Sequence, residues 1–360
     1  MRTRFDFLLF FAVIAVLALG LLTLKSASMA VSGGEGLAAR QMMMMGVGLA
    51  GALVVYVVNY RVWLEFAPLV FGGTVLLLIL VLLFGTTVHG SRSWLGMGFF
   101  RIQPSEIAKF STLLMAAWFC KGDKSPLLNF RRFIQLALIF GIPTALVLVQ
   151  PDFGTASTLA VLGGVLFFLL GLRFRIYVLL VLLLIGGIYV GWNYTFKPYQ
   201  KERILTFMNP ERDPLGRGYH VIQSKVAVGS GQMFGAGYRK GTQSKLKYLP
   251  EPHTDFIFAV YAEEFGFAGV TLALTLLLLI ISRMVNIARV AYDKPGMVIA
   301  IGAAGLLFYQ IVVSAGMIVG LLPTTGIPLP FFSYGGSATI TYLLIIGLVM
   351  NVFRNRFERM

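Results

Sequence analysis

Long runs of apolar residues follow one another along most of the chain. A helix that crosses a membrane needs about 20 mostly apolar residues. Ten runs approach or reach this length, and they cover residues 5–24, 42–58, 62–84, 104–120, 133–150, 154–172, 175–194, 256–281, 297–322 and 335–353. The pattern predicts an all-α integral membrane protein of about ten transmembrane helices, organised as one polytopic domain over residues 1–360.

The first run has an alternative interpretation as a cleaved signal peptide. Arg2 and Arg4 precede it, and the small residues around Ser28 and Ala30 resemble a cleavage site. The apolar core of a signal peptide is only about 7–15 residues long. Because this run is longer, we interpret it as a retained span.

The composition agrees with the membrane class and limits the other classes. Charged residues make up 12% of the chain, about half of the roughly 25% that is typical of soluble domains. The net charge of +15 is spread between the apolar runs rather than gathered in one stripe, so we expect no nucleic-acid partner. The single cysteine, Cys120, excludes an internal disulfide and a cysteine-built metal site.

Basic residues in the short loops predict the orientation, because lysine and arginine collect on the cytoplasmic side. With the N-terminus inside, the short outer segments carry only four basic residues: Lys25, Arg40, Arg92 and Arg101. The inner segments carry fifteen: Arg2, Arg4, Arg61, Lys121, Lys124, Arg131, Arg132, Arg173, Arg175, Arg283, Arg289, Lys294, Arg354, Arg356 and Arg359. Both termini are therefore expected in the cytoplasm.

One long hydrophilic segment, residues 195–255, is predicted as a large extracytoplasmic loop. It contains ten basic residues, among them Lys245 and Lys247. Loops of this length escape the orientation rule, so the basic charge requires another explanation. One is docking to the anionic headgroups of membrane lipids, and the other is a role in the protein's chemistry. Apolar periodicity from Tyr219 to Val226 predicts short helices at the membrane surface.

Acidic residues are few enough to be sorted by position. Five of them lie at or just inside the outer ends of predicted helices: Glu106, Asp152, Asp255, Glu263 and Glu264. Ionisable side chains at membrane depth are costly and are therefore candidate functional residues.

Each of these carboxylates also has a structural interpretation. Glu106 and Lys109 stand three residues apart on one helix face, where they can form an ion pair or a polar wall of a cavity. Asp152 is placed to cap the sixth helix. Glu263 and Glu264 follow two turns into the eighth helix, so one of them is expected to face inward.

Asp255 ends the long basic loop and precedes the eighth helix. It is either a helix cap or a base at the membrane–water boundary. A lone carboxylate beside many cations suits a reaction in which a base removes a proton while the cations take up phosphate charge. The residues alone leave these alternatives open.

The segment from Leu322 to Ala338 contains three prolines and breaks the regular helix. Irregular backbone at membrane depth is tolerated only where it is buried in protein or lines a wet cavity. No P-loop, nucleophile elbow, zinc-spaced His/Cys set or dinucleotide fingerprint is present in the sequence.

Several short motifs, taken in order, resemble the SEDS family (shape, elongation, division and sporulation), whose members include RodA, FtsW and SpoVE. The motifs are Arg40-Gln41, Arg92-Ser93-Trp94, Gln103 to Lys109, Gln150 to Thr155, Gly229 to Gly237, His253 to Phe256, Glu263 to Gly266 and Pro323 to Ala338. The short termini resemble the elongation member RodA rather than FtsW.

The resemblance implies a glycosyltransferase of the bacterial cytoplasmic membrane, which polymerises lipid II into β-1,4 glycan strands at the outer face for cell-wall elongation and rod shape. It also implies a class B penicillin-binding protein as partner, and Asp255 as the catalytic residue. The residues expected to bind substrate or line its cavity are Arg40, Arg92, Trp94, Arg101, Glu106, Lys109, Asp152, Lys245, Lys247, Glu263, Glu264 and Ser333. A divalent cation such as Mg²⁺ or Mn²⁺ is a further candidate for holding the diphosphates.

The alternative function is a lipid II transporter. Transporters place their key polar groups near the bilayer midplane on broken helices. The charged candidates here lie at the outer face, which favours the enzyme.

Overall fold

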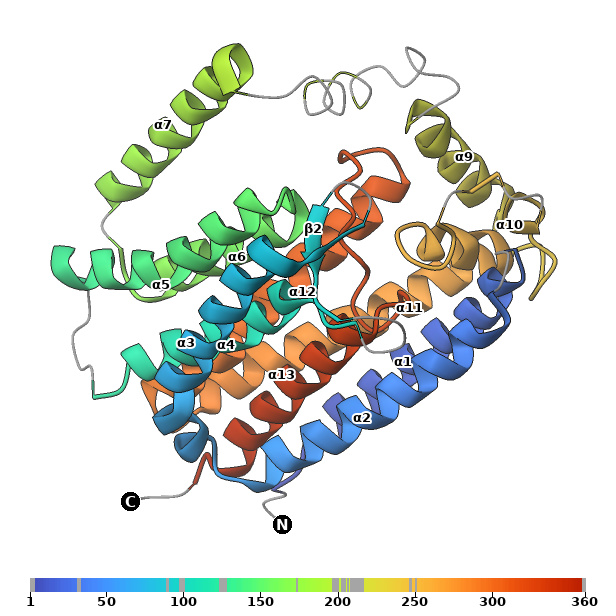
Figure 1. Cartoon of the computed structure of the whole chain (residues 1–360). Helices are drawn as coiled ribbons and strands as arrows, with labels where there is room; N and C mark the ends of the chain where they lie inside the picture. The colour runs from blue at the N-terminus through green and yellow to red at the C-terminus, as the bar shows by residue number, and fades with distance from the viewer. Residues whose placement is uncertain are drawn as a thin grey trace.

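The computed structural model describes residues 4–30, 34–88, 91–96, 101–122, 128–172, 174–195, 201, 205, 207, 217–245, 248–249 and 251–357. Ten long helices correspond one to one with the ten predicted runs (Figure 1). They are α1 (Phe7–Ala27), α2 (Leu37–Val57), α3 (Tyr60–Phe84), α4 (Pro104–Phe119), α5 (Phe130–Val149), α6 (Phe153–Leu169), α7 (Phe174–Val190), α11 (Ile257–Val290), α12 (Lys294–Ile318) and α13 (Gly336–Arg354).

Seven of the described helices are long and apolar enough to cross a membrane: α1, α2, α3, α5, α11, α12 and α13. The helices α4, α6 and α7 have 16 or 17 residues and lie near the lower limit of length. The integral membrane fold is confirmed. Two predicted boundaries were wrong: α2 begins five residues earlier, at Leu37, and α11 continues nine residues further, to Val290.

Smaller elements connect the long helices. Strands β1 (Thr86–Val88) and β2 (Ser91–Trp94) form an antiparallel hairpin that the sequence analysis did not predict. Within the long loop lie α9 (Arg217–Ser230) and the one-turn α10 (Thr242–Lys245). The helix predicted around Tyr219 is therefore confirmed. Short helical turns also cover Ser28–Ala30 and Gly34–Gly36, and a π-helical turn covers Gly191–Thr195.

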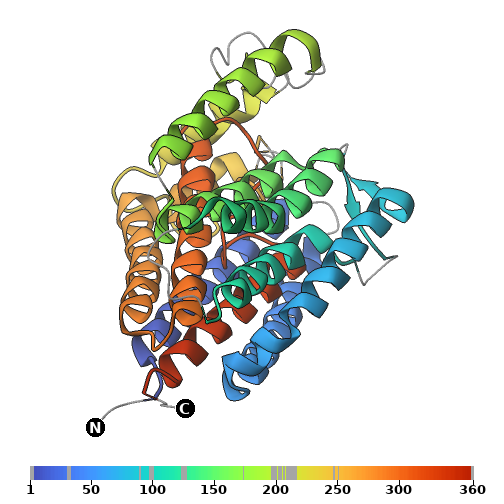
Figure 2. The same ribbon diagram turned by 90° about the vertical axis from the view of Figure 1, so that its left-hand side faces the viewer.

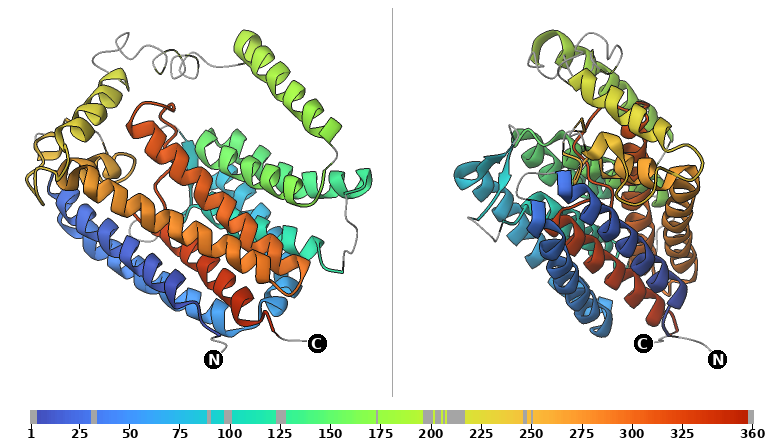
Figure 3. Two further views of the ribbon diagram at one scale, coloured as in Figure 1. Left: turned by 180° about the vertical axis from the view of Figure 1, so that it is seen from behind. Right: turned by 90° about the vertical axis from the view of Figure 1, so that its right-hand side faces the viewer.

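Both chain termini lie at one end of the helix bundle, and α9 and α10 lie at the opposite end (Figure 1, Figure 2). Helix α7 stands apart from the rest of the bundle in the front and rear views (Figure 1, Figure 3). Termini at one end agree with an even number of spans.

Polar residues in the sequence fix where several helices begin. Asp6, Asn59, Asn129, Asp152 and Asp293 each cap a helix, because a side-chain oxygen accepts a hydrogen bond from an amide of the first turn.

Glycines let α2 and α13 cross closely. A Cβ atom on Gly347 of α13 would lie 2.5 Å from the carbonyl oxygen of Ala52 in α2, and one on Gly48 would meet Leu343 at 2.6 Å. Helices in lipid associate through such close packing of small residues. The hydrophobic effect does not drive them together, because the lipid tails are as apolar as the helix surfaces.

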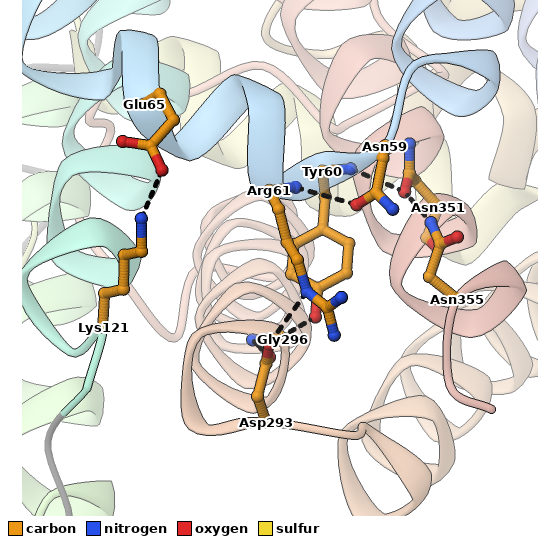
Figure 4. Close-up of polar contacts among 9 residues, drawn as sticks. All are labelled: Asn59, Tyr60, Arg61, Glu65, Lys121, Asp293, Gly296, Asn351 and Asn355. Atoms are coloured by element: carbon orange, nitrogen blue, oxygen red, sulfur yellow. Dashed lines mark hydrogen bonds and ion pairs between the residues drawn. The ribbon is translucent and has the colours of Figure 1, made fainter. Parts of the chain in front are cut away.

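A polar network near the chain termini joins four helix ends (Figure 4). The Asn351 side chain of α13 donates to the carbonyls of Val55 and Tyr56 at 2.6 and 3.1 Å, and accepts from the Tyr60 amide at 2.9 Å. The Tyr60 hydroxyl donates to Asp293 Oδ2 at 2.7 Å, and Asp293 also caps α12. The turn between α2 and α3 is therefore fixed at the end of the bundle opposite α9.

Candidate active site

The proline-rich segment after α12 folds against the turn that carries Asp255. The Tyr334 amide donates to the carbonyl of His253 at 2.9 Å. The buried Ser333 hydroxyl donates to the carbonyl of Thr254 at 2.9 Å and accepts from the Leu329 amide at 2.9 Å. Ser333 therefore fixes the backbone beside Asp255 and has a positioning role.

Asp255 is half-buried at the end of this turn. The cap residue of α11 is Phe256, so Asp255 lies one residue before the position from which a side chain usually caps the first turn. Its carboxylate faces Gly326: a Cβ atom built there would lie 3.8 Å from Asp255 Oδ2. Gly326 has a φ of +70°, which a glycine adopts without strain.

Asp152 lies on another side of the same segment. Its Oδ1 accepts from the Thr155 backbone amide at 3.0 Å, which confirms the predicted cap. Its Oδ2 lies 3.3 Å from the side-chain Nε2 of Gln103. A Cβ atom on the neighbouring Gly154 would be 2.8 Å from the carbonyl oxygen of Thr325. The structure thus gathers the starts of α4 and α6 and the Asp255 turn around residues 325–327.

Glu106 and Lys109 form a buried ion pair one turn into α4, with Lys109 Nζ 2.7 Å from Glu106 Oε2. Lys109 Nζ also lies 3.4 Å from the hydroxyl of Tyr342, which in turn donates to Gln310. The sequence analysis did not select Tyr342 or Gln310. The feature of the sequence that could have identified them is a polar side chain inside an otherwise apolar span.

Gln41 is a third residue that was not selected as a site residue, although it belongs to the Arg40-Gln41 motif. Its side chain accepts from the Gly335 amide at 3.3 Å and donates to Thr339 Oγ1 at 2.8 Å. It thereby joins α2 to the start of α13, beside the residues that bind the Asp255 turn.

Glu263 and Glu264 are both buried, so the expectation that only one of them faces inward was wrong. The physical reason is that the first two turns of α11, residues 257–264, are buried on every side, with α10 against Glu263 and the end of α1 against Glu264. Beyond them, α11 is broken at Gly266, whose φ of +64° interrupts the helix. Glu263 Oε1 accepts from the Gln243 amide at 2.8 Å and from Thr242 Oγ1 at 3.2 Å, which fixes the start of α10. Glu264 accepts from the hydroxyl of Ser26 at the end of α1.

The glycine-rich turn after α9 fills the break in α11. The amides of Ala236 and Gly237 donate to the carbonyls of Glu263 and Glu264 at 2.9 and 3.0 Å. In return, the Phe267 amide donates to the carbonyl of Gln232 at 2.8 Å. The backbone groups freed by the break are therefore satisfied by the turn, as buried polar groups require.

The predicted cations have different surroundings. Arg92 donates to the carbonyls of Leu82, Leu83 and Gly85 at 2.8–2.9 Å and so holds the C-terminal end of α3, a structural role. Arg40 and Arg101 are exposed, and Trp94 is half-buried in β2. Lys245 ends α10, and Lys247 lies outside the described residues.

Two buried polar atoms near Asp255 have no hydrogen-bond partner among the described residues: His253 Nδ1 and Thr325 Oγ1. Burial lowers the pKa of His253 below its usual value, although Glu251 nearby opposes this shift. The imidazole is therefore neutral at pH 7. Among the described residues, no group of three or more His, Cys, Asp or Glu side chains is placed to hold a metal ion.

Comparison with known proteins identifies the family. The chain is 42% identical over 321 residues to peptidoglycan glycosyltransferase MrdB of Escherichia coli K12, covering 89% of this chain and 86% of that protein. It is 37% identical to stage V sporulation protein E of Bacillus subtilis, covering 98% of each.

Solved structures agree. A chain from a peptidoglycan synthase complex superposes with a TM-score of 0.84 at 34% identity, covering 99% of both chains. Thermus thermophilus rod shape determining protein RodA superposes with a TM-score of 0.74 at 31% identity, covering 99% of this chain and 98% of that one. The FtsW/RodA/SpoVE family model, described as cell cycle protein, matches residues 6–358. The chain therefore belongs to this family, the SEDS family that its motifs resemble, and is RodA-like.

Proposed function

We propose that Asp255 is the general base with which this peptidoglycan glycosyltransferase joins lipid II units into β-1,4 glycan strands. The observation that carries the proposal is the placement of Asp255. It is a half-buried carboxylate one residue before the cap position of α11, and it lies where the starts of α4 and α6 and its own turn gather around residues 325–327.

The reaction requires one base and no acid. Lipid II carries its sugar on an α-linked diphosphate, and the product is β-linked, so the anomeric carbon is inverted. As the acceptor 4-hydroxyl attacks this carbon, its proton passes to the Asp255 carboxylate. The bond from the anomeric carbon to the phosphate oxygen breaks, and the diphosphate leaves with the electron pair. An inverting hydrolase needs an acid as well because its leaving group requires a proton, whereas a diphosphate is already a stable anion.

The unpartnered atoms beside Asp255 support a polar ligand at this place. Buried polar groups normally have partners, and an exception requires an explanation. A sugar hydroxyl can donate to the neutral His253 imidazole, and another can bond Thr325 Oγ1. We propose these two residues as contacts of the acceptor sugar.

Cations of the long loop and of the neighbouring loops, including Arg40, Arg101 and Lys245, are proposed to hold the diphosphates. Arg92 is less suited, because three carbonyls already occupy its guanidinium. The described residues form no carboxylate or histidine cluster for a resident metal. We derive no step through a divalent cation, and polymerisation measured with and without EDTA tests whether one is required.

The decisive experiment is Asp255→Asn, assayed as glycan synthesis from lipid II by purified protein. Asparagine keeps the size of aspartate but cannot accept the proton. The expected loss is roughly 10²–10⁴-fold. Glu35→Gln, at an exposed carboxylate before α2, is the matched control and should keep full activity.

Lipid II binding must be measured beside the rate. Retained binding and an unchanged melting temperature in detergent are expected for Asp255→Asn, because asparagine keeps the size of the side chain and a carbonyl oxygen that accepts hydrogen bonds. Near-normal polymerisation by the folded variant would refute the assignment.

We further propose a bacterial cytoplasmic membrane location with both termini inside, and a class B penicillin-binding protein as partner. In a Cys120→Ser background, a membrane-impermeant thiol reagent applied outside should modify Lys240→Cys and spare Arg356→Cys. The partner should raise the polymerisation rate. The reverse labelling pattern contradicts the orientation, and equal rates with and without the partner contradict its role.

A further inference from the structure

An exposed apolar tip lies on the glycine-rich turn that fills the break in α11. The tip residues Met233 and Phe234 are 59% and 81% exposed, and Phe267 just beyond the break is 62% exposed. Because Phe267 and Ala268 donate to the carbonyls of Gln232 and Met233 at 2.8 and 3.0 Å, tip and helix surface are adjacent. A Phe at this exposure in water is unfavourable by up to about 1.5–3 kcal/mol relative to a buried one.

The contacts between α1 and α11 give the depth of this tip. Near one end of α1, Asp6 pairs with Arg283 of α11 at 2.7 Å. Near the other end, Ser26 donates to Glu264. The 20 residues from Asp6 to Ser26 rise by about 30 Å at ~1.5 Å per residue, which equals the hydrocarbon thickness of a typical bilayer.

Glu264 therefore lies at the edge of the hydrocarbon layer on the side of the long loop. Gly266 and Phe267 follow it directly, on the lipid-exposed part of α11. The Met233 carbonyl is hydrogen-bonded to Ala268 at this level, and the adjacent Phe234 continues the apolar surface of the span beyond the break.

The residues that flank the tip fit a membrane interface. Tyr238 is exposed, Arg239 places its guanidinium 5.2 Å from the Tyr238 ring centroid, and Lys240 is exposed. Aromatic and basic side chains of this kind collect at the headgroup level. The order along the chain, an apolar tip followed by an aromatic and basic border, matches a segment that enters lipid only partway.

We infer that Met233 and Phe234 form an interfacial foot, which inserts into the boundary of the lipid leaflet on the side of the long loop. The glycine-rich turn is hydrogen-bonded to the break in α11, and Glu263 of α11 binds the start of α10. The foot therefore holds the turn and α10 at a fixed depth. The lipid contact does not depend on the reaction assigned to Asp255, so the two can fail separately.

The test places a nitroxide label at Phe234→Cys in a Cys120→Ser background, with the full chain in lipid nanodiscs. Collision rates with oxygen and with a nickel chelate are compared. Leu272→Cys, exposed on the span of α11, is the lipid reference, and Glu35→Cys, exposed before α2, is the water reference. We expect the oxygen-to-nickel ratio at Phe234 to lie clearly above that at Glu35 and below that at Leu272, because the tip enters lipid only partway.

Two outcomes would overturn the inference. A ratio equal to that at Glu35 would place the tip in water, and low collision with both reagents would show that protein, a second copy or a partner, covers it. If Phe234→Cys does not fold, Met233→Cys gives the same comparison. A wild-type melting temperature for the labelled protein shows that the turn itself is intact.

Discussion

Removing the lysine from the buried Glu106–Lys109 pair should destabilise the protein more than removing both charges. The Lys109 side chain is 0% exposed and that of Glu106 is 4% exposed, with 2.7 Å between Nζ and Oε2. Lys109→Met keeps the volume and leaves the carboxylate without its cation. Breaking a buried pair in this way costs about 3–5 kcal/mol, whereas replacing both partners with apolar residues is often neutral.

The contacts around the pair refine this magnitude. Tyr342 already donates to Gln310 and approaches Lys109 at 3.4 Å, so its hydroxyl can turn to Glu106 and recover part of the loss. We therefore expect Lys109→Met near the lower end of the range, about 3 kcal/mol. Glu106→Leu combined with Lys109→Met should lie within about 1 kcal/mol of the wild type.

Unfolding by SDS titration, followed by circular dichroism, measures these differences. Leu113→Met, at a buried apolar position on the same helix, controls for methionine in the core. If Lys109→Met keeps the wild-type unfolding midpoint but abolishes polymerisation, the pair is part of the chemistry and the structural explanation is refuted.

Three further substitutions test the support of the site. Gly266→Ala should lower the melting temperature and the activity together, because its Cβ would lie 2.3 Å from the Gly235 amide nitrogen at a φ of +64°. Wild-type stability would contradict the close packing of the glycine-rich turn against the break in α11. Ser333→Ala should lower kcat while lipid II binding stays, and Ser333→Thr, which keeps the hydroxyl, should restore kcat; equal kcat values for the two variants would argue against positioning. His253 should destabilise the folded state as the pH falls below about 6.5, the usual histidine pKa, because the unfolded chain takes up the proton first and the pKa in the folded state is lower. His253→Gln should therefore flatten the fall in melting temperature below that pH, and an unchanged slope would show that another group titrates.

The sequence by itself determined the ten helices and most of their starting points. Apolar runs report local solvation, since a helix that crosses lipid must be mostly apolar whatever packs against it. Caps such as Asp152 are equally local, because the side chain bonds an amide three residues away. Motif resemblance added the family and Asp255. None of these depends on how the helices are arranged.

Tertiary structure alone decided which polar residues act together. The first two turns of α11 are buried on every side and so bury both Glu263 and Glu264, which a one-sided helical period does not predict. Arg92 became a structural residue because the α3 carbonyls lie beside it. Gln41 and Ser333 reach the Asp255 turn only through the folded proline-rich segment. Such partners are separated by 7 to 294 residues, and hydrophobic periodicity carries no information about these contacts, so only the folded structure reveals them.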